Sequence, residues 1–122
     1  MTAMTKRILI VDDSPIILAA SAHALTEAGY LVETRNGVDD LVAQGFTGFD
    51  LILMDVQMPE LYGDDVAAVL RTERGVTTPI YLFSSVDEAE LAELAKGARV
   101  AGYISKQVGT EGLVERVRTI LS

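Results

Sequence analysis

Five short apolar runs recur along this chain of 122 residues, and each is followed by a stretch with helical spacing. The run Leu51–Met54 is apolar at every position, which is typical of a strand that is covered on both faces of a sheet. Alternation of strand and helix favours parallel strands joined by right-handed crossovers. The sequence therefore predicts one α/β domain with a doubly wound, five-stranded parallel sheet. The expected strands are residues 7–11, 30–34, 50–54, 79–83 and 101–104.

The segments between these strands have the apolar periodicity of helices. Ser14 suits the N-cap of the first helix and Pro15 its first position, and Gly29 is expected to end it. His23 falls opposite the apolar stripe, so we expect it to be exposed, without a catalytic or metal-binding role. The fourth helix is expected from Asp87 to Gly97. Residues expected to face inward are Ile17, Ala20, Ser21, Ala24, Leu25 and Ala28; Val38, Leu41, Val42 and Phe46; Val66, Val69 and Leu70; and Leu113, Val114, Val117, Ile120 and Leu121.

Composition excludes several classes of protein. The chain has no cysteine, which argues against a disulfide scaffold or a thiolate metal site. Its net charge of −8 disfavours direct binding of nucleic acid, which depends on neutralising phosphates with Lys and Arg. No apolar run is long enough to span a bilayer, and we expect a cytoplasmic protein that does not bind membranes. We also expect residues 1–5 to form a frayed tail and the remaining residues to leave no room for an output domain.

Polar side chains follow four of the predicted strands at the point where each strand ends. Asp12 and Asp13 follow the first, Asp55 the third, Ser84 the fourth and Lys106 the fifth. The carboxyl ends of parallel strands lie at one edge of the sheet, where ligands bind in open α/β folds, so these residues are expected to converge. Taken singly, the acids could be helix N-terminal residues, the serine a helix cap and the lysine a surface residue.

A convergence of this kind has a specific chemistry. Three neighbouring carboxylates repel one another unless a cation shares them, and hard oxygen ligands suit Mg²⁺. A carboxylate beside Mg²⁺ can attack an activated phosphorus, which makes Asp55 the candidate nucleophile. Lys106 and the Ser84 hydroxyl could contact the phosphoryl oxygens. The sequence therefore predicts a site that accepts a phosphoryl group.

Four motifs in order resemble the receiver domain of two-component response regulators, from about Thr5 to Ser122. Asp12-Asp13 after RILIV matches the acidic pair of that family, and Asp55 in DVQMPELYG matches its phosphoacceptor motif, Asp-x-x-Met-Pro-x-x-x-Gly. Ser84 after PIYLF stands at the Ser/Thr switch position. GARVAGYISK matches the segment that leads to the family's lysine, with Tyr103 at the aromatic switch position.

The resemblance implies a flavodoxin-like fold with strand order 2-1-3-4-5. It also implies that a histidine kinase or phosphotransfer protein donates a phosphoryl group to Asp55. Mg²⁺ would be held by Asp13, Asp55 and the main-chain carbonyl of Gln57, with Asp12 binding partly through water. The chain would act as a signalling module rather than an enzyme with an external substrate, because it would only accept and lose its own phosphoryl group.

The resemblance further implies a switch. Phosphorylation would draw the Ser84 hydroxyl toward the phosphoryl group, and Tyr103 would turn into the space that opens. The surface formed by the fourth helix, the fifth strand and the last helix would then change its affinity for a downstream protein.

One residue departs from the family pattern. Gln107 follows Lys106 where the family usually has proline, commonly with a cis peptide bond. A cis bond before a residue other than proline costs roughly 2.5–4 kcal/mol, so we expect a trans bond and a different setting for Lys106. This departure leaves open a pseudo-receiver that binds partners without phosphorylation. A flavin-binding module is a weaker alternative, because Asp12 and Asp13 would repel the flavin phosphate.

Overall fold

The computed structural model of the chain describes residues 5–58 and 62–122, and its centre is a five-stranded parallel sheet. The strand order is β2-β1-β3-β4-β5, and all four neighbouring pairs are parallel, as predicted. Most of the tail expected at residues 1–5, and the loop expected around Pro59, lie outside the described residues. The strands are β1 (Arg7–Asp12), β2 (Leu31–Asn36), β3 (Leu51–Met54), β4 (Ile80–Ser84) and β5 (Gly102–Ser105).

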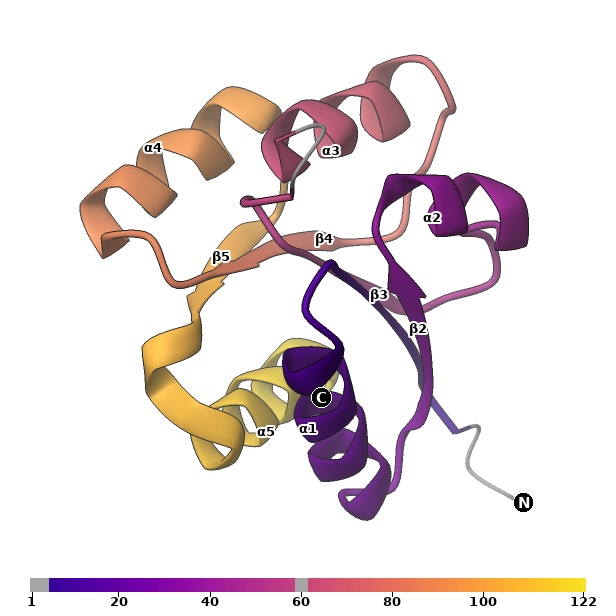
Figure 1. Ribbon diagram of the computed structural model, residues 1–122, viewed down its shortest axis with the longest axis vertical. Coiled ribbons are helices and arrows are strands. Elements are labelled where there is room, and N and C mark those ends of the chain that lie inside the picture. The colour runs from indigo at the N-terminus through magenta and orange to yellow at the C-terminus, as the bar shows by residue number, and fades with distance from the viewer. Residues whose placement is uncertain (1–4, 59–61) are drawn as a thin grey trace.

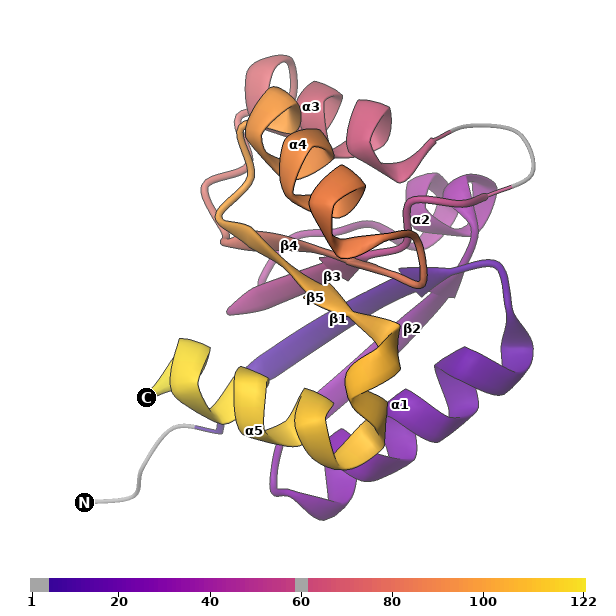
Figure 2. The ribbon, with the colours of Figure 1, turned by 90° about the vertical axis from the view of Figure 1, so that its left-hand side faces the viewer.

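Helices cover both faces of the sheet. Helices α1 and α5 lie on one face, and α2, α3 and α4 lie on the other (Figure 1). The view turned by 90° shows the same three layers edge-on (Figure 2). This arrangement confirms the doubly wound α/β fold. The helices are α1 (Pro15–Glu27), α2 (Val38–Gln44), α3 (Gly63–Thr72), α4 (Glu88–Ala98) and α5 (Gly109–Leu121), and a 3₁₀ turn, η1 (Lys106–Val108), precedes α5.

The core consists of two apolar layers, one on each side of the sheet. Ile8 and Ile10 of β1 pack in the layer beneath α1 and α5, whereas Leu9 and Val11 pack in the layer beneath α2, α3 and α4. Side chains alternate between the faces of a strand, so β1 contributes to both layers. The apolar runs of the sequence are therefore apolar because both of their faces are buried.

The first helix begins as predicted but buries a different set of residues. Ser14 caps it with a side-chain oxygen that accepts the N–H of Ile17 at 3.4 Å. Leu18, Ser21 and Leu25 are its buried residues, whereas Ala20, expected to be inward, is exposed. The buried stripe therefore contains Leu18, which the predicted stripe left out. Alanine residues are a weak guide to which face of a helix is buried, because an alanine side chain buries little area on either face.

Two valines expected to be buried are exposed instead. Val42 of α2 has 69% of its surface exposed and Val69 of α3 has 44%. Each is next in sequence to a buried leucine, Leu41 and Leu70 respectively. Successive residues of a helix point about 100° apart, so a helix that buries the leucine turns the adjacent valine outward.

The remaining boundaries differ from the predicted ones by a few residues. Helix α4 runs from Glu88 with Asp87 as its N-cap, and β2 extends through Asn36. His23 is exposed, as predicted, with its imidazole Nε2 3.9 Å from Oε1 of Glu27. No helix in the described part of the chain is long and apolar enough to cross a membrane.

Candidate functional site

The carboxyl ends of β1 and β3 bring three acids together. Asp12 is the last residue of β1 and Asp55 directly follows β3. The strands pair with Val11 opposite Met54, and the N–H of Asp55 donates to the carbonyl of Val11 at 2.8 Å. Carboxylate oxygens of Asp12, Asp13 and Asp55 lie within 4.8 Å of one another. The predicted convergence of these acids is thus present.

Lys106 reaches into the same acids from the end of β5. Its Nζ lies 2.7 Å from Oδ2 of Asp12 and 3.2 Å from Oδ1 of Asp55. The ammonium also lies 5.5 Å from the centre of the Phe83 ring. The described residues contain no cis peptide bond, so the bond between Lys106 and Gln107 is trans, as expected. The trans bond leaves the lysine in contact with both acids.

The environment of Asp55 raises its affinity for a proton. Only 3% of the residue is exposed. Burial raises the pKa of Asp55 from 3.8 to about 6; the charge of Lys106 opposes this rise and the charge of Asp12 adds to it. The backbone N–H of Gln57 donates to Oδ1 of Asp55 at 3.4 Å, which also favours the charged form. Asp55 is therefore a buried acid that gains from any further positive charge placed beside it.

The backbone of Gly63 packs directly against the backbone carbonyl of Asp55. Gly63 is the first residue of α3, and its N–H donates to the carbonyl of Val56 at 2.9 Å. A Cβ built on Gly63 would lie 1.6 Å from the carbonyl oxygen of Asp55, a distance that no side chain can occupy. The sequence showed Gly63 only as the last position of the phosphoacceptor motif. The structure gives the physical reason, which is the close approach of two backbone segments.

The donor set of the acid cluster fits a hard divalent cation. Oδ2 of Asp12 is buried and accepts no hydrogen bond, so its ion pair with Lys106 is its polar contact within the described chain. Three carboxylates in reach of one another offer the oxygen ligands that Mg²⁺ prefers. Gln57, two residues after Asp55, is exposed and forms an isolated antiparallel bridge with Tyr62. A metal-ligating role for the Gln57 carbonyl stays a prediction.

The two predicted switch residues lie on neighbouring strands. Ser84 ends β4 and is fully buried, and its Oγ accepts the N–H of Val86 at 3.3 Å. Tyr103 on β5 is half-buried and packs against the core beneath α4. Its hydroxyl lies 3.4 Å from Oε1 of Glu88, and its carbonyl accepts a hydrogen bond from Arg116 at 3.1 Å. Tyr103 therefore links β5 to both α4 and α5.

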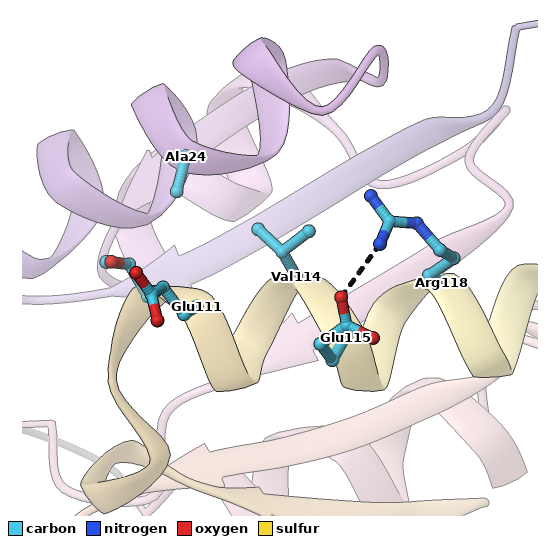
Figure 3. A pocket seen from close by; sticks show the side chains of 6 residues that line it. Ala24, Glu111, Val114, Glu115 and Arg118 are labelled. Atoms are coloured by element: carbon cyan, nitrogen blue, oxygen red, sulfur yellow. Dashed lines mark hydrogen bonds and ion pairs between the residues drawn. The ribbon is translucent and has the colours of Figure 1, made fainter.

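A separate hollow of about 350 Å³ lies between α1 and α5. Figure 3 shows Val114 of α5 pointing toward α1 near Ala24, while Arg118 is paired with Glu115 at 2.8 Å. The lining contains none of the predicted site residues. The predicted site residues therefore lie at the edge of the sheet and not in this hollow.

Comparison with known proteins gives a consistent result. The family model described as "Response regulator receiver domain" matches residues 8–118. The nisin biosynthesis regulatory protein NisR of Lactococcus lactis subsp. lactis is 35% identical over an alignment of 117 positions that covers 93% of this chain and 49% of NisR. The transcriptional regulatory protein TcrA of Mycobacterium tuberculosis is 33% identical over 93% of this chain and 45% of its own length. The chain thus spans about half the length of these curated relatives.

Solved structures agree with the sequence matches. The chemotaxis protein CheY4 of Vibrio cholerae superposes with a TM-score of 0.84 at 28% identity, over 96% of this chain and 99% of its own. A CheY-like receiver domain protein of Methanospirillum hungatei superposes with a TM-score of 0.80 at 27% identity, over 97% and 94% of the two chains. That residues 1–122 act without an output domain stays a prediction.

Proposed function

Because this chain belongs to the response regulator receiver domain family, we propose that Asp55 accepts a phosphoryl group from a histidine kinase or a phosphotransfer protein. Phosphorylation then changes the affinity of the chain for a downstream protein. The observation that carries this proposal is the contact of Lys106 with two buried acids, Asp55 among them, next to a third carboxylate. A single cation among three acids leaves the cluster with an excess of negative charge that a metal ion would balance.

The transfer uses the Asp55 carboxylate as the nucleophile. One of its oxygens forms a bond to the phosphorus while the bond from phosphorus to the donor's histidine nitrogen breaks, and the electron pair of that bond stays on the nitrogen. Lys106 lies 3.2 Å from Asp55 Oδ1, where its positive charge stabilises the negative charge of the phosphoryl oxygens. Backbone contacts of Asp55 with Val11 and of Gly63 with Val56 hold the attacking group in place.

Asp12, Asp13, Asp55 and the carbonyl of Gln57 would hold Mg²⁺ in this proposal. When bound, the ion neutralises charge that the carboxylates and the phosphoryl oxygens share. The protein's own part is to bring the three carboxylates together at the ends of β1 and β3. Lys106 pairs with two of these acids, Asp12 and Asp55.

We propose that the output passes through Ser84 and Tyr103. Ser84 turns its hydroxyl from the N–H of Val86 toward the phosphoryl group, and Tyr103 then gives up its contact with Glu88 and turns inward. The affected surface comprises α4, β5 and α5, where a groove of about 460 Å³ is lined in part by Tyr103, Glu88 and Arg116. A downstream protein that prefers one setting of Tyr103 shifts the population toward it. The site of action in this proposal is the cytoplasm.

Gln107 motivates the alternative of a receiver that works without phosphorylation. The trans bond before Gln107 would favour that alternative if it withdrew Lys106 from the acids. Lys106 instead contacts both Asp12 and Asp55. The geometry therefore supports the phosphorylated switch.

Phosphorylation can be tested with acetyl phosphate and Mg²⁺. We expect intact-mass spectrometry to show one added phosphoryl group on the wild type and none on Asp55→Asn. Glu90→Gln, which changes an exposed acid of α4, is the matched control and should be labelled like the wild type. Equal labelling of the wild type and Asp55→Asn, or no labelling and no beryllofluoride binding by the wild type, would contradict the proposal. A coloured purified protein would instead point to a flavin.

The switch can be tested by a pull-down that compares phosphorylated wild type with Asp55→Asn. We expect at least one protein to be enriched in only one of the two samples. Identical partner lists would show that phosphorylation does not select the partner.

A further inference from the structure

An apolar groove lies between α2 and α3, and its lining contains neither Asp55 nor any residue of α4, β5 or α5. Its volume is about 270 Å³, and its lining includes Val42, Phe46 and Val69. Both helices lie on the same face of the sheet, next to each other (Figure 1, Figure 2). Val42 and Val69 are the two valines that the sequence pattern placed in the core and the structure leaves exposed. Their exposure therefore occurs at one place on the surface.

Both helices carry acids in their first turns; Asp65 of α3 lines the groove, and Asp39 of α2 lies outside its lining. Asp39 precedes Val42 by three residues on α2, and Asp65 precedes Val69 by four residues on α3, so each acid shares a helix face with its valine. Both helices return from strands of one parallel sheet, which places both N-termini toward the carboxyl edge of the sheet. The acids also complement the helix dipoles. Arg74, just beyond α3, lines the groove on the side of the helix C-termini.

This pattern defines the chemistry of the occupant. The groove has an apolar floor, with Asp65 near the N-terminus of α3 and Arg74 beyond the other end of that helix. An amphipathic helix fits it when an apolar stripe faces Val42 and Val69 and lysines or arginines lie near Asp39 and Asp65. A second copy of this chain is a poorer occupant than a basic helix, because its net charge is also −8.

We propose that the α2–α3 groove, lined in part by Val42, Phe46 and Val69, is a docking site for a basic amphipathic helix of a partner protein. The bound helix buries the exposed valines, and its basic residues pair with Asp39 and Asp65. The site is separate from Asp55, so the proposal does not depend on phosphorylation.

The probe is a fluorescent helical peptide of about four turns, with a leucine stripe flanked by lysines. A second peptide has the same stripe with glutamates in place of the lysines. Fluorescence anisotropy is measured with the unphosphorylated protein in EDTA, so that failure of the phosphorylation proposal would not affect the result. We expect the lysine peptide to bind at least about tenfold more tightly than the glutamate peptide, and less so as salt rises.

Variants locate the binding. The double variant Val42→Ser and Val69→Ser should bind the lysine peptide about tenfold or more weakly than the wild type does, because two apolar contacts are lost. Both valines are exposed, so circular dichroism and melting should show a folded protein. Leu31→Ser changes another exposed aliphatic residue, with 56% exposure on β2 and outside this groove, and should bind like the wild type. Asp39→Asn with Asp65→Asn should reduce the preference for lysine over glutamate.

Three results would overturn the proposal. One is equal binding of the lysine and glutamate peptides, and another is undiminished binding to the double valine variant. The third is a dimer in analytical ultracentrifugation that the double valine variant abolishes, because a second copy would then be the occupant.

Discussion

Replacing Asp55 with asparagine should stabilise the folded protein above pH 6 and have little effect near pH 4. The pKa of Asp55 is raised in the folded state, so folding favours its protonated form. Its contribution to stability is full below pH 4, where the acid is protonated in both states, and is lost as pH rises through about 6. Asparagine is neutral at every pH and escapes this loss.

The size of the effect follows from the shift. A rise from 3.8 to about 6 corresponds to roughly 3 kcal/mol at about 1.4 kcal/mol per pKa unit. The attraction of Lys106 for the ionised Asp55 is already contained in this shift, and in the variant Lys106 keeps Asp12 at 2.7 Å. We therefore expect the free energy of unfolding of Asp55→Asn, relative to that of the wild type, to rise by about 1–3 kcal/mol as the pH increases from 4 to 7.

Urea denaturation in EDTA at half-unit steps of pH measures this difference. Groups that titrate alike in both proteins cancel, so the difference curve reports Asp55. Glu90→Gln is the control, and an exposed substitution of this kind should stay within about 0.5 kcal/mol of the wild type throughout. A flat difference curve for Asp55→Asn, or one that falls as pH rises, would refute the reasoning that burial dominates the setting of Asp55.

Further predictions concern the metal, the glycine and the lysine. Mg²⁺ at about ten times its dissociation constant should add about 1.4 kcal/mol to the wild type's free energy of unfolding at pH 7.5. An equal gain for Asp55→Asn would show that the ion binds elsewhere. Gly63→Ala should lose about 1–3 kcal/mol or more and slow labelling by acetyl phosphate, because its Cβ would overlap the Asp55 carbonyl. Gly97→Ala, in open space on α4, should be neutral or stabilising by up to about 1 kcal/mol in the same urea titrations. Lys106→Ala should lose about 3–5 kcal/mol in urea at pH 7.5 and less at pH 5, because it leaves buried acids unpaired. Lys96→Ala, an exposed lysine of α4, should change little at either pH.

The architecture was predictable because strands buried on both faces leave an unambiguous pattern. Leu51–Met54 is apolar throughout and every residue of it is buried. Helix faces were less predictable. Val42 and Val69 match an inward stripe as well as their leucine neighbours do, and a pattern of period 3.6 does not decide which of two adjacent apolar residues faces the sheet. That choice depends on where the neighbouring helices lie.

The site was predictable to the level of which side chains converge. Topology alone places Asp12, Asp55 and Lys106 at one edge, and the distances agree. The burial that shifts the pKa of Asp55 was not predictable, because it depends on how the surrounding side chains pack. The role of Gly63 was hidden for a similar reason, since a contact between two backbone segments leaves no trace in side-chain pattern.

The contact of Gly63 with Asp55 joins two surfaces that differ in chemistry. Helix α3 begins against the carbonyl of Asp55 and continues into the wall of the groove that contains Val69. A helix that binds this groove more tightly in one state of the Asp55 site must, by thermodynamic reciprocity, favour that state by the same factor. A coupling of about 1.4 kcal/mol would change either affinity tenfold. A partner docked in the groove would then shift the population of the states of the Asp55 site, and the state of that site would in turn change the partner's affinity.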